Sequence, residues 1–313
     1  MSLSVRQNVE LKDYSTFKVG GPARYFVAVT TLEELHQALA EAKEKNWPTF
    51  ILAGGSNVIF PDTGFPGLVI YIQHHHLKVD GTTLEAGAAV MMQEVVDAAV
   101  EAGLKGVEWA GGLPGTFGGA IRGNAGAFKG EIKDSVVSVT SIEQKTGREI
   151  TRRNADCQFG YRDSIFKHRP EVIVSAILQL EPGDPTELRQ IADSRIEFRQ
   201  NRHPLEYPNV GSIFKNTPLE RVPEQWLPHF HDFIKVDPFP IIPTGKIIED
   251  SGLKGYRIGD AQVSEKHANY IVNRGNATAR DIVALIEHIR QTVREKFQIE
   301  LETEPEILQE NNQ

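Results

Sequence analysis

The sequence predicts an α+β protein with α/β elements, divided into two or three domains. Its length of 313 residues exceeds what one compact core usually holds. Residues 1–75 read as strand, helix, strand, glycine turn and strand, which is a small α/β unit. Further strands and helices alternate on both sides of a glycine-rich stretch at residues 109–129. These features indicate a mixed fold that contains a large ligand-binding loop.

Local patterns place the individual elements. The sequence Thr31-Leu-Glu-Glu34 is a capping box and predicts a helix that runs to about residue 46. A second long helix is predicted to begin at Thr278 and to end at about residue 296, because its apolar residues recur on one face. Short helices are predicted at 91–102, 186–199 and 246–251. Apolar runs predict strands at 25–29, 49–53, 68–72, 83–87, 136–142, 149–151, 172–180 and 299–304.

Composition and charge restrict the function. The formal net charge of −8 disfavours nucleic acid and anionic membranes as partners, so an anionic substrate needs a local basic patch. The single cysteine, Cys157, excludes an intrachain disulfide and fits a reducing compartment. We find no signal peptide and no apolar run near the ~20 residues of a membrane helix, so we expect a cytoplasmic protein.

Three consecutive histidines, His74 to His76, raise the question of a metal site. In a strand, alternate side chains point to opposite faces, so three neighbours cannot all face one ion. Solvated side chains at a strand end explain these histidines better. We therefore predict no metal site.

Gly54-Gly55-Ser56-Asn57 follows a predicted strand and is a candidate anion site. Successive N–H groups in such a turn form a nest for an anion, and Ser56 and Asn57 add side-chain donors. An ordinary tight turn has the same composition. The chain has neither G-x-x-x-x-G-K-[ST] nor G-x-G-x-x-G after a strand, which disfavours P-loop hydrolysis and a Rossmann fold.

The stretch from Trp109 to Lys129 contains seven glycines and Pro114. A regular helix would lose about 1 kcal/mol per glycine relative to alanine, so turns and irregular pieces are predicted. Large apolar residues such as Phe117 distinguish the stretch from a flexible linker and indicate a buried loop around a ligand. Together with the first glycine turn, it would hold one diphosphate from two sides.

Two further motifs carry groups suited to catalysis. Arg162, between Tyr161 and Asp163, is suited to stabilising developing negative charge. The alternative is a surface turn in which Arg162 forms an ion pair with Asp163. Ser212 lies in no G-x-S-x-G pattern, which disfavours an acyl-enzyme mechanism. Two roles remain for it: a proton donor in catalysis, or a serine that only stabilises a turn. Basic and amide side chains over 254–269 suit phosphate or sugar recognition, or a solvated surface.

These motifs resemble the UDP-N-acetylenolpyruvoylglucosamine reductase (MurB) family. Seven segments match in the family's order, and seven ordered matches are far more specific than one. The resemblance implies a three-domain FAD-binding fold of the vanillyl-alcohol-oxidase/PCMH type with a C-terminal substrate-binding MurB domain. The matching segments are 16–23 (TFKVGGPA), 52–59 (LAGGSNVI), 108–126, 160–166 (GYRDSIF), 211–216 (GSIFKN), 252–255 with 267–273, and 301–304.

The resemblance also implies an activity and a set of residues. NADPH reduces non-covalent FAD, and flavin N5 passes hydride to UDP-N-acetylenolpyruvoylglucosamine, which becomes UDP-N-acetylmuramate for peptidoglycan. Ser212 is implied as the proton donor, with Arg162 and a C-terminal glutamate as groups that stabilise the intermediate. The implied cofactor contacts are Gly54, Gly55, Ser56, Asn57, Gly112, Pro114, Gly115, Thr116, Gly118, Gly119, Asn124 and Ala125. The implied substrate contacts are Tyr161, Arg202, Lys215, Asn216, His267 and Asn269.

Two glutamates compete for the C-terminal role. A literal match to the family's Glu-Pro-Glu selects Glu306, whereas an ungapped register from Lys296 selects Glu304. We choose Glu304, because that register preserves the preceding helix and strand. Pro305 then lies one place later than in the family pattern.

The resemblance finally implies an organisation and partners. Residues 199–212 are similar to the family type without an inserted tyrosine loop, so a more open site is expected. The partner is a UDP-sugar and neither nucleic acid nor membrane, and the protein is a monomer or weak oligomer. The implied domains are FAD subdomains at 1–75 and 76–200, a substrate domain at 201–298, and a C-terminal strand and tail at 299–313.

Two alternatives remain open. One is a sugar or aldonolactone oxidase of the same flavin fold, which commonly tethers flavin through a histidine near the first phosphate loop; His74 to His76 are not in that position. The other is a flavin- or nucleotide-sugar-binding protein without activity. The joint presence of Arg162, Ser212 and Glu304 disfavours it.

Overall fold

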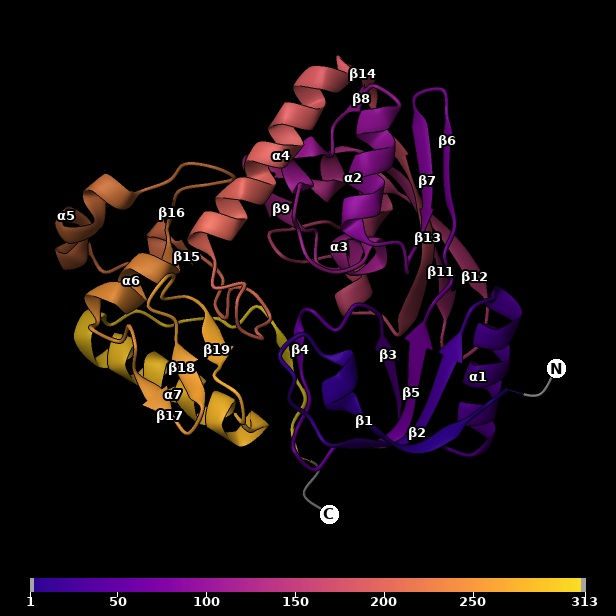
Figure 1. Cartoon of the computed structure of the whole chain (residues 1–313), viewed down its shortest axis with the longest axis horizontal. Coiled ribbons are helices and arrows are strands. Elements are labelled where there is room, and N and C mark those ends of the chain that lie inside the picture. Colours follow the sequence, from indigo (N-terminus) through magenta and orange to yellow (C-terminus); the bar gives the residue numbers. More distant parts are fainter. Residues whose placement is uncertain (1–2, 311–313) are drawn as a thin grey trace. The chain divides into compact units, whose positions relative to one another are not determined.

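The computed structural model describes residues 3–310 of the chain. These residues form two compact units built from interleaved segments (Figure 1). The chain passes from the first unit to the second between Gly55 and Ser56, inside the first glycine turn. The first unit holds the residues up to Val9, Ala23–Gly55 and Phe65–Arg199, and the second holds Glu10–Pro22, Ser56–Gly64 and the chain from Gln200.

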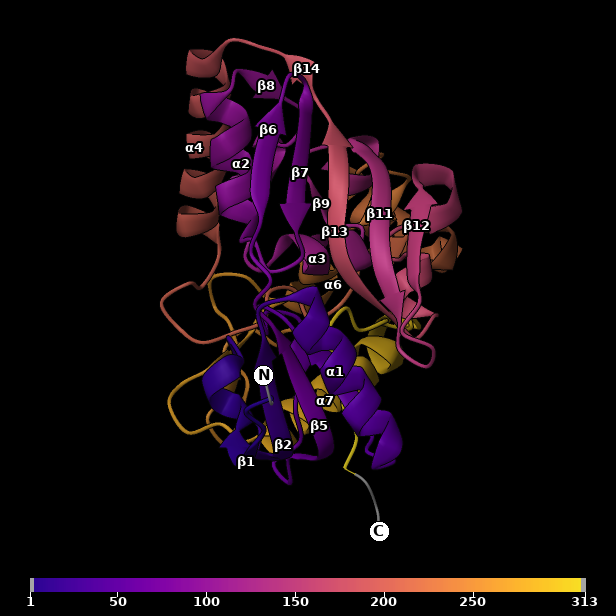
Figure 2. The ribbon, with the colours of Figure 1, turned by 90° about the vertical axis from the view of Figure 1, so that its right-hand side faces the viewer.

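One sheet of the first unit is the predicted α/β unit. Its strand order is β1-β2-β5-β3, and β5 pairs in parallel with both β2 and β3. The helix α1 (Leu32–Glu44) begins at the predicted capping box, in which Thr31 and Glu34 cap each other's backbone, and it packs against β5 (Figure 2). The strands are β1 (Arg6–Glu10), β2 (Pro22–Val29), β3 (Thr49–Leu52) and β5 (Phe65–Ile72).

The other sheet of the first unit is antiparallel and has the order β12-β11-β13-β7-β6 (Figure 2). Its strands are β6 (Leu77–Asp80), β7 (Thr83–Gly87), β11 (Val136–Glu143), β12 (Glu149–Arg153) and β13 (Glu171–Gln179). The helices of this part are α2 (Met92–Glu101), α3 (Phe117–Arg122) and α4 (Pro185–Arg202). Two short pairs complete it, β8 (Leu104–Lys105) with β14 (Glu181–Pro182) and β9 (Gly126–Ala127) with β10 (Gly130–Glu131).

Apolar residues from both sheets and from the helices α1, α2 and α3 form one continuous core in the first unit. Full burial of a Val, Leu or Ile side chain contributes roughly 1.5–3 kcal/mol, so this core is what fixes the glycine loops relative to the strands. The 3-10 turns of this unit are Glu108–Ala110, Ile132–Asp134, Asn154–Cys157 and Ile165–Lys167.

The second unit is a small sheet packed on one long helix. The antiparallel strands β17 (Arg257–Ile258), β18 (Ala261–Val263) and β19 (Ile271–Asn273) lie along α7 (Ala279–Phe297) (Figure 1). Seven residues of α7 are buried, in agreement with its predicted apolar face. The remaining helices and strands are α5 (Leu227–Phe230), α6 (Thr244–Asp250), β4 (Val58–Ile59), β15 (Thr217–Pro218), β16 (Ile241–Ile242) and β20 (Glu306–Ile307).

The N-terminal and central segments that belong to the second unit are bound into it. Phe17 and Ile59 are part of its core. Asp62 accepts hydrogen bonds from the N–H groups of Ala279 and Arg280 at 2.8 and 3.0 Å, so it caps the first turn of α7. The 3-10 turns of this unit are Leu11–Tyr14, Leu219–Arg221, Glu224–Trp226 and His231–Phe233.

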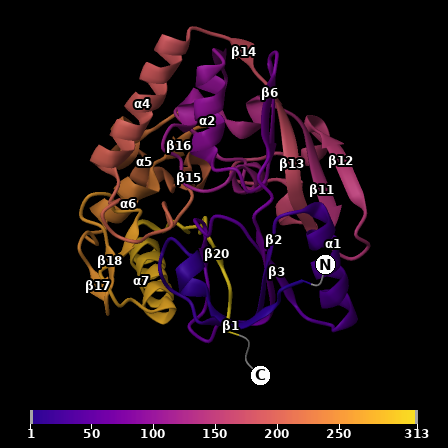
Figure 3. The same ribbon diagram turned by 45° about the vertical axis from the view of Figure 1, so that its right-hand side comes forward.

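The predicted strand at 299–304 is wrong. That segment makes a single antiparallel bridge, Phe214 with Thr303, and the strand β20 begins only at Glu306 (Figure 3). Pro305 ends this pairing after Glu304, because a proline has no N–H to continue a ladder. Before Pro305 the chain bonds residues 213–215, and after it β20 pairs in parallel with β4.

The prediction that residues 109–129 contain only turns is also wrong. Phe117–Arg122 form the helix α3, although Gly118 and Gly119 lie inside it. The Thr116 side chain caps the Gly119 N–H, and Phe117, Gly118, Ala120 and Ile121 are buried. Tertiary packing therefore outweighs the low helix propensity of the glycines.

Candidate functional site: two glycine turns and two catalytic segments

The two glycine turns meet inside the first unit. A Cβ placed on Gly54 would lie 3.2 Å from the Cα of Gly115 and 3.4 Å from the Thr116 nitrogen. Gly55 and Gly115 have φ values of +61° and +97°, which favour glycine. The prediction that two separate loops act on one ligand thus has a geometric basis, because their backbones touch.

Free N–H groups distinguish the residues of these turns. Within residues 3–310, the N–H groups of Gly54, Gly115 and Thr116 donate no hydrogen bond to the protein. The Gly112 N–H, in contrast, donates to Gln93 Oε1 at 2.8 Å, and that of Gly118 donates to the Ala88 carbonyl at 3.0 Å. The first three residues have donors to offer an anion, whereas Gly112 and Gly118 serve the fold.

The other predicted cofactor residues differ in their exposure and in their backbone partners. Pro114 and Gly119 are exposed. Ala125 is tied to Ala120 and Ile132 through its backbone. Ser56 and Asn57 belong to the second unit, where the Asn57 carbonyl accepts the Glu306 N–H at 3.0 Å.

Asn124 is fully buried, and its amide is used by the protein. Its Nδ2 donates to the Gly160 carbonyl at 2.8 Å and to Glu131 Oε1 at 3.1 Å, and its Oδ1 accepts the Lys133 N–H at 3.2 Å. A buried amide with these partners fixes the start of the Arg162 turn. Asn124 thus supports the Arg162 turn through its side chain.

Arg162 lies in a tight hairpin between Gly160 and Asp163, which exchange two backbone hydrogen bonds. Its φ of +55° is unusual for a residue with a side chain and costs roughly 1–2 kcal/mol. The guanidinium donates to the Gly126 carbonyl at 2.7 Å and lies 5.2 Å from the Tyr161 ring centre. Strain of this kind at a predicted catalytic residue is what a functional constraint produces.

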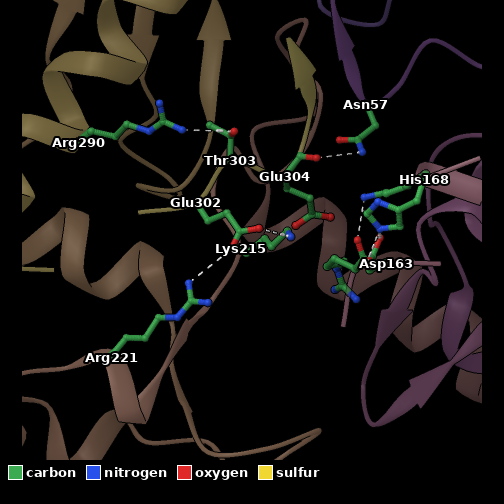
Figure 4. A network of polar contacts seen from close by, with 11 residues as sticks. Asn57, Asp163, His168, Lys215, Arg221, Arg290, Glu302, Thr303 and Glu304 are labelled. Carbon is green, nitrogen blue, oxygen red and sulfur yellow. Dashed lines mark hydrogen bonds and ion pairs between the residues drawn. The ribbon is translucent and has the colours of Figure 1, made fainter. Parts of the chain in front are cut away.

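Asp163 does not pair with Arg162 in the way a plain surface turn would suggest; it pairs with His168 at 2.9 Å (Figure 4). Partial burial acts to raise the pKa of Asp163, but the hydrogen bond and charge of His168 outweigh it and lower that pKa. The Arg162 carbonyl is held by the Lys167 ammonium at 2.7 Å.

Ser212 and Glu304 are brought together within the second unit. The Glu304 N–H donates to the carbonyl of Ile213 at 2.9 Å, and the Lys215 N–H donates to the carbonyl of Glu302 at 2.9 Å. The serine segment and the C-terminal segment therefore run side by side. Glu306 lies in β20 instead, where its N–H donates to the Asn57 carbonyl.

A cluster of charges surrounds the C-terminal segment (Figure 4). Lys215 Nζ lies 2.5 Å from one carboxylate oxygen of Glu302, and Arg221 Nη1 lies 3.4 Å from the other. The hydrogen bond from Lys215 lowers the pKa of Glu302. Sequence reasoning found Lys215 and missed Arg221 and Glu302, since the ion pair joins residues far apart in the chain.

The remaining predicted substrate residues are placed differently from one another. Arg202 is exposed at the end of α4, and Asn216 Oδ1 accepts the Thr244 N–H at 3.3 Å. His267 is mostly buried against the rings of His203 and Tyr270. Asn269 is 3% exposed; its side-chain amide bonds the Phe214 backbone, and its N–H donates to His267 Nδ1.

No cluster of three or more His, Cys, Asp or Glu side chains suited to a metal ion occurs within residues 3–310. No helix in the described part of the chain is long and apolar enough to cross a bilayer.

The chain is similar along nearly its whole length to known reductases. Residues 23–152 match the FAD binding domain family, and residues 203–308 match the C-terminal domain of UDP-N-acetylenolpyruvoylglucosamine reductase. The reductase of Clostridium novyi is 36% identical over 310 residues, covering 99% of this chain and 94% of the relative. The chain belongs to the UDP-N-acetylenolpyruvoylglucosamine reductase family.

Further members agree with this assignment. The reductase of Lactobacillus delbrueckii subsp. bulgaricus is 37% identical over 98% of this chain and 96% of its own length. The crystal structure of the Thermus caldophilus reductase (MurB) has a TM-score of 0.77 at 30% identity and covers 99% of this chain and 100% of that chain. The predicted FAD-binding fold, MurB domain and flavin-dependent reductase are confirmed, and the oxidase alternative receives no support.

The geometry predicts different results at two adjacent glycines of α3. A Cβ at Gly118 would lie 2.6 Å from the Ala88 Cβ, whereas at Gly119 the nearest atom is the Thr116 hydroxyl at 3.5 Å. We expect Gly118→Ala to cost about 1–3 kcal/mol through overpacking and to lose bound flavin. We expect Gly119→Ala to keep or raise the melting temperature, since alanine favours a helix by up to about 1 kcal/mol.

Melting temperature and flavin absorbance, measured on both variants, check this prediction. Equal melting temperatures for Gly118→Ala and the unchanged protein would contradict it. Loss of flavin from a Gly119→Ala variant of normal stability would instead identify Gly119 as a direct cofactor contact.

His267 predicts a pH dependence of stability. Burial lowers the pKa of His267 below 6.5, and the charges of Lys254 and Lys235 lower it further. The unfolded chain therefore binds a proton more readily than the folded one just below pH 6.5. This contribution to the free energy of unfolding is present above that pH and is lost as the pH falls below it.

Urea unfolding between about pH 7.5 and about pH 5, around the usual histidine pKa, measures the effect. The His267→Gln variant should lose this part of the pH dependence. If the variant and the unchanged protein show the same slope of unfolding free energy with pH, His267 is not its source.

Proposed function

We propose that this chain catalyses the NADPH-dependent reduction of UDP-N-acetylenolpyruvoylglucosamine to UDP-N-acetylmuramate through non-covalently bound FAD, a step in making peptidoglycan precursors. Family membership over nearly the full chain supports the activity. The observation that carries the residue roles is the direct backbone pairing of the Ser212 and Glu304 segments. This pairing of two backbone segments from distant parts of the sequence supports the proposal that Ser212 and Glu304 act on one substrate.

The glycine turns of the first unit fit the FAD diphosphate. A Cβ at Gly54 would press against Gly115, and the N–H groups of Gly54, Gly115 and Thr116 lack acceptors among residues 3–310. Anion nests are built from N–H groups of this kind. FAD held by these turns would supply the enolpyruvyl double bond with hydride obtained from NADPH.

The chain's own residues handle the charge that develops on the substrate. Addition to the double bond leaves negative charge next to a carboxylate, so a fixed cation beside it lowers the barrier. Arg162 supplies that cation from a strained and rigid hairpin. Ser212 gives the proton that completes the reduction, and Glu304 orients the charged groups.

The UDP group requires positive charge inside a protein of net charge −8. Lys215 and Arg221 form a basic pair that Glu302 holds together, and the exposed Arg202 adds a third cation. We assign Lys215 and Arg202 to the diphosphate and Asn216 and Tyr161 to other parts of the substrate. The absence of an inserted tyrosine loop leaves this site open.

The setting of the protein is part of the same proposal. Its substrate and cofactors belong to the cytoplasm, where we place it, as a monomer or weak oligomer without nucleic-acid or membrane partners. The single cysteine, Cys157, is buried, which suits a reducing compartment.

Anaerobic spectroscopy tests the activity. The purified protein should be yellow, should bleach with NADPH, and should recolour when UDP-N-acetylenolpyruvoylglucosamine is added without O₂. A colourless protein that never takes up FAD contradicts the proposal. Recolouring by O₂ and not by the enolpyruvyl substrate would favour the oxidase instead.

A further inference from the structure

Asn269 is bonded to the segment that carries Ser212. Its Nδ2 donates to the Phe214 carbonyl at 2.8 Å, and its Oδ1 accepts the Phe214 N–H at 3.0 Å. Its own carbonyl accepts the Ile213 N–H at 2.8 Å. One residue thus makes three hydrogen bonds to the two residues that follow the serine.

The side-chain amide of Asn269, a predicted substrate contact, is engaged by the protein. The residue is 3% exposed, and both heavy atoms of its amide are occupied by Phe214. Buried polar atoms that are satisfied in this way give a segment one fixed position. Removal of the Asn269 amide would leave the N–H and the carbonyl of Phe214 without these partners.

The opposite edge of the serine segment is held by the C-terminal strand. Glu304 donates its N–H to Ile213, and Lys215 donates its N–H to Glu302. The segment therefore lies between Asn269 and the residues around Glu304. Within residues 3–310 the Ser212 hydroxyl itself makes no hydrogen bond, so its position depends on these neighbours.

His267 fixes Asn269 in turn. The Asn269 N–H donates to His267 Nδ1 at 3.2 Å, and the rings of His203 and Tyr270 pack on that imidazole. An Nδ1 that accepts a hydrogen bond requires the proton on Nε2 in the neutral ring. Asn269 is therefore itself held by an imidazole that packs against two other rings.

We infer that Asn269 is a positioning residue for the proton transfer from Ser212, an inference that rests on the function proposed above. In that step the Ser212 O–H bond breaks, a C–H bond forms on the substrate carbon, and the serine alkoxide takes a proton from water. Such a transfer needs the hydroxyl within hydrogen-bond reach of the carbon. A displacement of about 1 Å costs on the order of 100-fold in rate.

Asn269→Ala tests the inference, with Asn273→Ala as the matched control. Asn273 is 2% exposed and bonds Phe17, Gly275 and Ala277, and none of these bonds involves the serine segment. Asn269→Ala should slow the reoxidation of reduced flavin by the enolpyruvyl substrate by about 10- to 100-fold. It should raise the solvent deuterium isotope effect of that step and leave flavin reduction by NADPH and the substrate Kd unchanged.

Asn273→Ala should lower the melting temperature and leave both half-reactions and the isotope effect unchanged. In a Ser212→Ala background, Asn269→Ala should add no further slowing, because both changes then act on one missing proton transfer. If Asn269→Ala yields no folded protein, Asn269→Asp keeps the acceptor for the Phe214 N–H and should show the same selective loss.

Three kinds of altered behaviour overturn the inference, and normal reoxidation by Asn269→Ala overturns it as well. The three are equal slowing of both half-reactions, a weaker substrate Kd without a change in the isotope effect, and full additivity with Ser212→Ala. The proposed function fails separately: if Ser212→Ala leaves reoxidation at the normal rate, Ser212 is not the proton donor. If Ser212→Ala slows reoxidation and Asn269→Ala does not, the proposed role of Ser212 stands and only the positioning role of Asn269 is overturned.

Discussion

Ser212→Ala is expected to lower the rate of flavin reoxidation by the enolpyruvyl substrate by about 10²- to 10⁴-fold, the range that general acid catalysis contributes. Reduction of the flavin by NADPH should continue at its normal rate, because no proton from Ser212 takes part in it. The hydroxyl has no hydrogen bond within residues 3–310, so its removal leaves no buried partner unsatisfied. The melting temperature should therefore stay nearly unchanged.

Stopped-flow measurement of the two half-reactions checks this result. Ser251→Ala is the matched control in the same unit, because the Ser251 hydroxyl donates to the Ile247 carbonyl at 2.9 Å and has a structural role at the end of α6. That control should lower stability and leave reoxidation unchanged. A Ser212→Ala variant that slows both half-reactions, or neither, would contradict the assignment of Ser212 as proton donor.

The sequence was most informative where a local signal determines the backbone. Thr31 with Glu34, and Thr278 with Asp281, form the capping boxes that start α1 and α7. Apolar runs placed the strands β11 and β12 correctly. These signals need no knowledge of the rest of the chain, since capping and periodicity act within a few residues.

Predictions from the sequence failed where distant contacts decide. The low helix propensity of Gly118 was real, but packing against Ala88 favours the helix α3 there. The strand predicted at 299–304 makes only the bridge between Thr303 and Phe214, and the next strand, β20, begins after Pro305 with a different partner. Neither contact is visible in a short stretch of sequence.

The site residues show the same limit. Asn124 and Asn269 lie in motifs that indicate ligand binding, and both are buried against main-chain groups that lie 36 and 55 residues away. From sequence alone, an asparagine that contacts a ligand looks the same as an asparagine that positions a neighbouring residue. The burial and the two amide partners make that distinction.

Glu304→Gln is expected to lower kcat by about 10²- to 10³-fold, the range measured when one group that stabilises a transition state is removed. Glu306→Gln should keep nearly normal kcat. The reason lies in the backbone: Glu304 bonds Ile213 beside Ser212, whereas Glu306 is exposed in β20 and bonds Asn57. The two substitutions are chemically identical and two residues apart, so each controls for the other.

Steady-state kcat and melting temperature of both variants decide between the two glutamates. A loss at Glu306→Gln with normal turnover at Glu304→Gln would show that the register with Glu-Pro-Glu is correct. Pro305 makes the outcome informative, because it separates two segments with different partners. The residues before it pair with residues 213–215, and the strand β20 after it pairs with β4. The backbones of Glu304 and Glu306, on the two sides of that proline, are held by different segments, so the two variants test which segment carries the catalytic carboxylate.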